Sequence, residues 1–156
     1  MRRGRRVSRR GLILTGMVAS LSGCLGGGET DDSAPLNHMG LIEIVVDGEE
    51  VDLGADRFQA EYADDYAMEF HLHEFDDFWY NEAERRITLA EALDYLPEFH
   101  FNVEDDGEIL TIDEETYDSR EESVTIEYTV NGEDIDPSSY KLDDKDEIVV
   151  TIVTDA

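Results

Sequence analysis

Short apolar segments separated by acidic turns dominate the chain from Gly40 onward, which is the pattern of a β-rich domain. Residues 42–46 are mostly isoleucine and valine, and residues 49–53 combine valine and leucine with acids. The Asp47-Gly48 dipeptide between them tolerates the positive φ angles that a two-residue type I′ turn requires. The pattern therefore predicts a β-hairpin over residues 42–53.

The hairpin pattern recurs near the C-terminus. Residues 126–136 align with residues 42–52 without a gap, and six of these positions are identical. In the first copy the identical residues are Ile42, Glu43, Val46, Gly48, Glu49 and Asp52. The repeat indicates either an internal duplication or two hairpins that acquired the same turn independently, and the sequence is compatible with both.

Between the two copies the pattern predicts a strand and one short helix. Residues 67–73 alternate, with Met68, Phe70 and Leu72 on one face and Glu69, His71 and His73 on the other. Thr88 and Glu91 have the spacing of a capping box, which predicts a helix that begins after Thr88 and ends before Pro97.

The last apolar run predicts a central strand. Residues 148–153 are apolar on both faces, as is typical of a strand with neighbours on both sides. Together with the hairpins and the helix, this run predicts an α+β fold for a single domain over residues 40–156.

The order of these elements resembles the ubiquitin-like β-grasp, and specifically its sulfur-carrier branch. The resemblance lies in the helix that starts Ile87-Thr88-Leu89-Ala90-Glu91-Ala92-Leu93, in Val130-Asn131-Gly132-Glu133 and in the run from Leu142 to Val150. It implies a mixed sheet with one short helix over about residues 66–153, preceded by the hairpin at 42–53. It does not imply the carrier function, because the chain ends in Thr154-Asp155-Ala156 and not in a diglycine.

The N-terminal segment has the composition of an export signal. Six of the 12 basic residues lie in positions 2–10, and no acidic residue precedes Glu29. The apolar run at 12–21 is shorter than the ~20 residues that a membrane-spanning helix needs. The segment 1–23 is therefore predicted to be a signal peptide that is removed from the mature protein.

Two motifs make the export prediction more specific. Ser8-Arg9-Arg10-Gly11-Leu12-Ile13 resembles a twin-arginine signal, in which Arg9 and Arg10 are read, and Leu21-Ser22-Gly23-Cys24 resembles a lipobox. These resemblances imply that Cys24 is lipidated, that residues 24–39 form a flexible linker, and that the protein is anchored through lipid to the extracellular face of the cell membrane. The competing interpretation of Cys24 is a free thiol or half of an intermolecular disulfide.

The charge of the chain that remains after removal of residues 1–23 limits the classes of partner and of environment that we expect. Residues 24–156 carry six basic and all 40 acidic residues, a formal net charge of −34. Disorder, a surface that mimics DNA and adaptation to molar salt compete to explain this charge. The periodic apolar residues disfavour disorder, and electrostatic repulsion excludes nucleic acid as a partner. Strong screening at high salt favours a halophilic protein, and the organisation also resembles twin-arginine-exported lipoproteins of haloarchaea, which implies no activity.

The clearest candidate chemistry is the group Glu69, His71 and His73. Residues i and i+2 of a strand share a face with Cα atoms about 7 Å apart, so a His-x-His pair can converge on one metal ion. Zinc or copper accepts such a set, with His38, His100 or Glu74 as completing ligands. In the competing interpretation, the two histidines lie on a solvated polar face of the strand and the protein has no cofactor. His100 is then packed at the start of a strand.

Other features offer weaker candidates. Two interpretations compete for the aromatic residues Phe75, Phe78, Trp79 and Tyr80, namely a groove for a peptide or sugar and the hydrophobic core, of which the core is favoured. The acidic turns 104–108 and 143–146 lack the ligand spacing of a calcium loop. The chain has no phosphate-binding glycine loop, nucleophile elbow or histidine-helix zinc motif. We therefore expect a non-catalytic binding or accessory module for a protein or small molecule, with a zinc- or copper-binding protein as the alternative.

Overall fold

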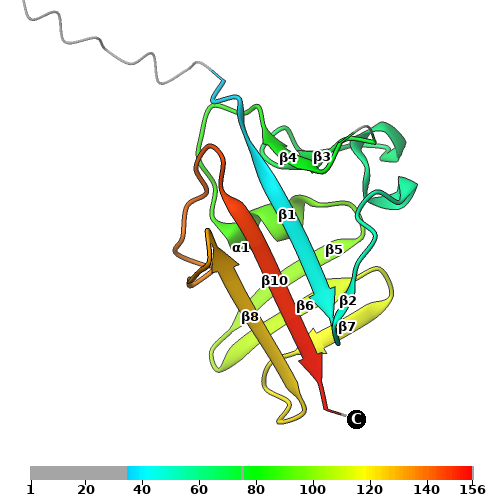
Figure 1. The fold of residues 1–156 in the computed structure, drawn as a ribbon, viewed down its shortest axis with the longest axis vertical. Helices are drawn as coiled ribbons and strands as arrows, with labels where there is room; N and C mark the ends of the chain where they lie inside the picture. The colour runs from blue at the N-terminus through cyan, green and yellow to red at the C-terminus, as the bar shows by residue number, and fades with distance from the viewer. Residues whose placement is uncertain (1–34, 75, 156) are drawn as a thin grey trace, which may run out of the picture. The chain divides into compact units, whose positions relative to one another are not determined.

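The computed structural model describes residues 35–74 and 76–155, which form a mixed α+β structure of two sheets and one α-helix (Figure 1). The predicted signal peptide, Cys24 and residues 25–34 of the predicted linker lie outside the described residues, as does Phe75. The α+β class predicted from the sequence is confirmed for the described part of the chain.

The first sheet is built around two parallel strands, β1 (His38–Val46) and β10 (Glu147–Thr154). On the far side of β10 lies the antiparallel strand β8 (Val124–Val130), which pairs with the short β9 (Glu133–Asp134). The predicted central position of the last strand is confirmed, because β10 lies between β1 and β8.

The other edge of β1 is covered in two separate places. One end of β1 pairs with β4 (Phe78–Asn81), which in turn pairs with β3 (His71–Leu72). The opposite end pairs with β2 (Glu49–Glu50). Strand partners along this edge therefore stop at Leu41 and resume at Val45.

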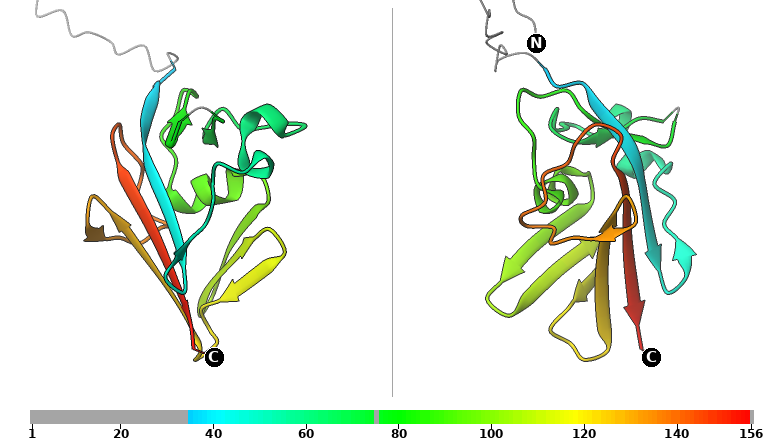
Figure 2. Two further views of the ribbon diagram at one scale, coloured as in Figure 1. Left: turned by 45° about the vertical axis from the view of Figure 1, so that its right-hand side comes forward. Right: turned by 60° about the vertical axis from the view of Figure 1, so that its left-hand side comes forward.

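A smaller antiparallel sheet and the helix complete the domain. The sheet consists of β5 (Phe99–Glu104), β6 (Gly107–Ile112) and β7 (Glu115–Asp118), and the helix is α1 (Leu89–Tyr95). Both lie against the same face of the first sheet (Figure 2), and no described element covers the opposite face of β1, β10 and β8. Two single-turn 3₁₀ helices, Asp56–Phe58 and Ala60–Tyr62, connect β2 to the segment before β3.

The core lies between the first sheet and the elements on its covered face. Ile44, Val150 and Ile152 from the central strands are fully buried, as are Leu93 from α1 and Leu110 from β6. At about 25 cal/mol per Å² of buried apolar surface, these contacts are the main stabilising contribution to the fold.

The start of the helix follows the sequence prediction. Glu91 N–H donates to Thr88 Oγ1 at 3.2 Å, and Thr88 N–H donates to Glu91 Oε2 at 2.8 Å, so the capping box is complete. Leu89 and Leu93, one turn apart, turn toward the core.

Three sequence predictions require correction. The first hairpin does not precede the sheet as a separate unit, because β1 pairs with β10 in its centre, and its returning strand is only Glu49–Glu50. The ordered strand begins at His38, within the predicted linker 24–39. The predicted strand over 67–73 is reduced to His71–Leu72, and Phe70, His71 and Leu72 are buried consecutively because this short segment packs on both sides.

Candidate functional site

His71 is a core residue and does not lie on a solvated strand face. Its side chain is 1% exposed, and its Nδ1 lies 3.1 Å from the carbonyl oxygen of Ala67. Its Nε2 is buried without a hydrogen-bond partner, and the nearest carboxylate oxygen, Glu82 Oε2, is 3.7 Å away. Burial disfavours the charged imidazolium and therefore lowers the pKa of His71.

His73 lies beside His71 and is tied to an acidic residue. The two imidazole rings meet edge to face with centroids 4.9 Å apart, and Tyr80 packs against both. His73 Nδ1 lies 2.6 Å from Glu61 Oε1. The structure therefore brings His71 and His73 together, as the sequence predicted, but orients one ring toward Glu61.

The other predicted metal ligands take different partners. His38 Nδ1 lies 3.8 Å from Asp143, and Glu74 accepts a hydrogen bond from the Tyr62 hydroxyl at 2.6 Å. His100 is exposed on β5 and is not packed at a strand start, because its neighbour Phe99 takes the inward position. Glu69 lies in the turn before β3. Within residues 35–74 and 76–155, no three His, Cys, Asp or Glu side chains are arranged to hold a metal ion.

Trp79, the central residue of the aromatic segment 78–80, belongs to the hydrophobic core. Trp79 is 1% exposed and stacks on Phe70 with ring centroids 5.4 Å apart. Its indole Nε1–H donates to the carbonyl oxygen of Asp146 at 3.1 Å. The glycine at position 40 makes this contact possible, because a Cβ there would lie 2.1 Å from the same oxygen.

The two acidic turns are held by protein groups. Arg120 binds Glu104 and Asp118 beside the first turn. In the second turn the buried Asp146 carboxylate accepts hydrogen bonds from Asn131 Nδ2 at 2.9 Å and from the Asp143 N–H at 2.8 Å. These contacts give both turns a structural role.

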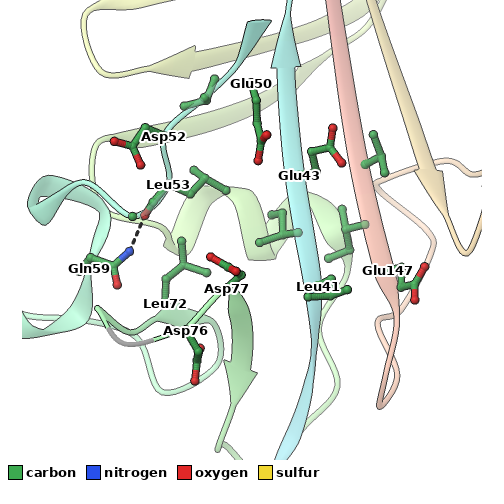
Figure 3. Close-up of a pocket in the computed structure, with 15 residues that line it drawn as sticks. Leu41, Glu43, Glu50, Asp52, Leu53, Gln59, Leu72, Asp76, Asp77 and Glu147 are labelled. Carbon is green, nitrogen blue, oxygen red and sulfur yellow. Dashed lines mark hydrogen bonds between the residues drawn. The ribbon is translucent and has the colours of Figure 1, made fainter.

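A pocket lies where the edge of β1 lacks a strand partner. The gap between β2 and β4 opens into a cavity of about 360 Å³, which we call the β2–β4 pocket (Figure 3). Its apolar surface comes from β1, β3, β10 and the segment after β2, through Leu41, Ile42, Val51, Leu53, Leu72, Ile148 and Val149. A cavity of this size is within the range of small-molecule sites.

The polar lining of the β2–β4 pocket is acidic. Six carboxylates surround it, namely Glu43, Glu50, Asp52, Asp76, Asp77 and Glu147. None of the 15 described lining residues is a lysine, an arginine or a histidine. The pocket therefore offers hydrogen-bond acceptors and negative charge to a ligand.

Gln59 is the buried polar residue of this pocket. Its side chain is 1% exposed, and its Nε2 donates to the carbonyl oxygen of Leu53, whereas its Oε1 has no hydrogen-bond partner. The orientation of the amide follows from the chemistry, because a carbonyl oxygen only accepts and must face the nitrogen. In Figure 3 the nitrogen is turned to Leu53 and the oxygen points away from that contact. An unpaired buried acceptor costs about 1–3 kcal/mol.

The sequence analysis missed this pocket, because its lining comes from segments that are distant in the chain. The stretch 50–53 indicated only the returning strand of the hairpin, the pair Asp76-Asp77 carried no motif, and Gln59 lies in a loop without periodicity. The sequence contained one signal for the pocket. The alternation of apolar and acidic residues after Gly48 is short, so the returning strand of the hairpin can pair with only a small part of β1.

The second hairpin forms a related hollow. Ile126, Glu127, Asp134, Ile135 and Asp136 line a cavity of about 400 Å³. These five positions align with five positions that line the β2–β4 pocket, from Ile42 to Asp52. The hairpin sequence itself therefore contributes to both cavities.

The geometry defines the class of the protein as a small α+β domain with an acidic, partly apolar pocket. The chain matches no protein-family model, and no curated protein and no solved structure matches it. Among the described residues, no helix has the length and apolar character needed to cross a membrane.

Proposed function

We propose that this protein is an exported, lipid-anchored binding module that holds a small ligand in the β2–β4 pocket on the extracellular face of the cell membrane. The observation that carries the proposal is a cavity of about 360 Å³ that has an apolar surface, six carboxylates and no basic residue among its 15 described lining residues. The proposed role is non-catalytic.

The pocket is tested by an NMR ligand screen on the full chain. Anionic, neutral and cationic small molecules are added separately, and the backbone amide signals of Val51, Leu53 and Gln59 are followed. We expect at least one class to shift these signals in a saturable way, and Leu53→Trp, which fills the cavity, to abolish the shifts. If none of the three classes shifts them, the proposal is wrong.

We further propose that the fold is a divergent β-grasp. The support is that β1 and the last strand β10 are parallel neighbours, that β8 lies antiparallel on the other side of β10, and that α1 packs on one face. The sheet of β5, β6 and β7 is then an addition between the helix and β8. An experimental structure with a different order of the central strands would contradict this assignment.

Export and anchoring are tested separately. We expect Arg9→Lys/Arg10→Lys to trap the precursor inside the cell, because the twin-arginine pair is then absent. We expect Cys24→Ser to release the protein from the membrane fraction, because the lipid contributes the membrane affinity. Unchanged fractionation of both variants in the native host would contradict the signal assignment.

The net charge of −34 for residues 24–156 supports adaptation to molar salt. At ~1 M salt the Debye length is about 3 Å, so the carboxylates repel one another weakly, whereas at millimolar salt the repulsion reaches across the domain. We expect transfer from molar to millimolar salt to unfold the domain, as followed by circular dichroism. A melting temperature that is the same in both conditions would contradict this proposal.

Zinc or copper binding at His71 and His73 is the second candidate function. The observation that favours it is the buried Nε2 of His71, which has no hydrogen-bond partner, on a ring whose centroid lies 4.9 Å from that of His73. Native mass spectrometry with each metal tests it, with His38→Ala/His100→Ala as a control that removes the same number of histidines. Stoichiometric metal that is lost only in His71→Ala/His73→Ala supports this candidate, and a metal-free wild type contradicts it.

A further inference from the structure

We infer that the outer edge of β8 binds an extended peptide with basic side chains, which adds to the first sheet as an antiparallel strand. This edge is separate from the β2–β4 pocket, so the inference does not depend on what that pocket holds. It follows from unpaired backbone groups on the edge, from the strand that fills the aligned edge of β1, and from the charge of the hollow beside β8.

The outer edge of β8 has unpaired backbone groups in its middle. β8 is the outermost long strand of the first sheet (Figure 1), and β9 pairs only with its last two residues. Farther back, the Tyr128 carbonyl accepts from Ile135 N–H, and Val124 N–H donates to the Glu121 carbonyl, both at 3.0 Å. Alternate residues of a strand face the same edge, so the backbone of Ile126 also faces outward. Within the described residues, neither its N–H nor its C=O has a hydrogen-bond partner.

The repeat of the hairpin shows which kind of element fills this place in the first copy. There the edge of β1 pairs with β2 at one end and, farther back, with the antiparallel strand β4 at residues 38–41. When the alignment is continued by two residues, residues 40–41 correspond to residues 124–125 at the start of β8. No described strand takes the corresponding place on β8. The first hairpin therefore accepts an antiparallel strand at a place that is open in the second.

A hollow beside the edge of β8 has room for side chains of the added strand. Its volume is about 400 Å³, and its lining is half apolar or aromatic and half acidic. The first group is Ile126, Tyr128, Ile135 and Pro137, and the second is Glu108, Glu127, Asp134 and Asp136. Successive side chains of a strand point to opposite faces, so an extended peptide can place apolar and basic side chains alternately beside this lining.

The charge of this lining decides between a second copy of the chain and a basic peptide. None of the eight described lining residues is a lysine, an arginine or a histidine. A second copy would bring further carboxylates, since residues 24–156 contain 40 acidic and six basic residues. A lysine opposite Glu127 would instead form a cross-strand pair of opposite charge, which stabilises a sheet. In molar salt such pairs act only at contact, so main-chain hydrogen bonds contribute most of the affinity.

NMR titration of the full chain in molar salt tests the inference. The probe is a seven-residue peptide of alternating valine and lysine with blocked ends, and the reference is the same peptide with glutamate in place of lysine. We expect the lysine peptide to shift the amide signals of Ile126 and Glu127 in a saturable way, and the glutamate peptide to bind at least about tenfold more weakly. Hydrogen exchange at the Ile126 amide should slow in the complex, because this N–H is then bonded.

Two methylated versions of the lysine peptide test the role of its main chain. In an extended peptide the valine N–H groups face one edge and the lysine N–H groups face the other, so methylation of either set blocks one edge. Because β8 pairs with a single edge, we expect one methylated peptide to lose at least about tenfold in affinity and the other to stay within about threefold of the parent. Equal affinities of the two methylated peptides would overturn the inference.

Variants locate the site on β8. Ile126→Pro removes the outward N–H at a kind of position where edge strands accept proline, and we expect it to abolish binding. Asp134→Asn/Asp136→Asn removes two charges from the hollow and should weaken binding about fivefold. Glu50→Gln/Asp52→Asn removes the aligned charges of the first hairpin and should leave binding within about twofold. Melting temperatures show whether each variant is folded, and if Ile126→Pro is not, the two charge variants decide.

Three other outcomes would overturn the inference. The first is a lysine peptide that does not bind, and the second is a peptide that shifts only the signals of Val51, Leu53 and Gln59, which lie around the β2–β4 pocket. The third is a dimer of the chain, seen by analytical ultracentrifugation and lost in Ile126→Pro, which would assign the edge to a second copy. The small-molecule screen of the β2–β4 pocket follows different signals, so its result stands apart from all three.

Discussion

The two hairpins have nearly the same local structure and different surroundings. In the first, Val46 pairs with Glu49 and Val45 with Glu50, and in the second Val130 pairs with Glu133 and Thr129 with Asp134. The next backbone hydrogen bond is also shared, from Val51 to Ile44 at 2.8 Å and from Ile135 to Tyr128 at 3.0 Å. The sequence repeat therefore corresponds to a repeat of register and turn.

The surroundings separate the two copies. β1 is a central strand parallel to β10, whereas β8 is antiparallel to β10 and has only the two-residue β9 on its other side. After the first hairpin the chain returns with Gln59 to form the wall of a pocket, whereas after the second Pro137 is buried and the chain leaves toward α1. The comparison teaches that the hairpin motif forms part of the lining of each cavity and that the segment after the hairpin decides which residues complete that lining.

The largest expected effect is the loss of stability when an isoleucine is truncated in the central strand β1, compared with the same change in β8. Ile44→Ala empties a fully buried site in β1, and we expect it to lower the free energy of unfolding by about 3 kcal/mol. Ile126→Ala, at a half-buried position of β8, should cost about 1 kcal/mol. Chemical denaturation measures both, and equal losses would contradict the different placement of the two strands.

The second effect concerns the one chemical difference between the turns. The Asn131 amide donates to the buried Asp146 at 2.9 Å, and its oxygen accepts from Glu147 N–H at 3.0 Å. Asn131→Asp gives this turn the residue of the first and places a second carboxylate against Asp146, which should cost about 2 kcal/mol. A thermal melt that matches the wild type would show that the two turn residues are interchangeable.

The third effect should be equal in both hairpins. Gly48 and Gly132 have φ angles of 83° and 79°, in the region that other residues adopt only with strain. Gly48→Ala and Gly132→Ala should each lower the free energy of unfolding by about 1 kcal/mol. A clear difference between the two values, measured by denaturant titration, would mean that the turns are less similar than their backbones indicate.

The smallest effect is a pH dependence at Asp47. Hydrogen bonds from the Thr154 hydroxyl and N–H, at 2.6 Å and 2.7 Å, lower the pKa of Asp47. Because the folded-state pKa lies below the unfolded value of about 3.9, the stabilisation is present above pH ~4 and is lost as the pH falls through the folded-state pKa.

Asp47→Asn should therefore lower the melting temperature at neutral pH, and the difference from the wild type should shrink below pH ~4. Thr154→Val serves as the control, because it removes the hydroxyl donor and should reduce the effect of the Asp47 substitution. A difference between wild type and Asp47→Asn that does not change with pH would rule out this origin of the stabilisation.

The sequence by itself determined the features that depend on neighbours along the chain. The capping box of Thr88 and Glu91, the turns at Gly48 and Gly132 and the apolar character of the last strand each need residues within a few positions of one another. Their hydrogen bonds are local, so the amino-acid pattern is sufficient to predict them.

Only the tertiary structure decided the pairing of β1 with β10, the burial of His71 and the β2–β4 pocket. β1 and β10 are joined by pairs such as Ile44 with Val150, about a hundred residues apart in the chain, and nothing local favours that partner over another strand. His71 alternates with apolar residues as a solvated residue would, yet packing on both sides of a short strand buries it. The pocket exists because strand partners are missing along part of the β1 edge, and such a gap depends on how distant segments meet.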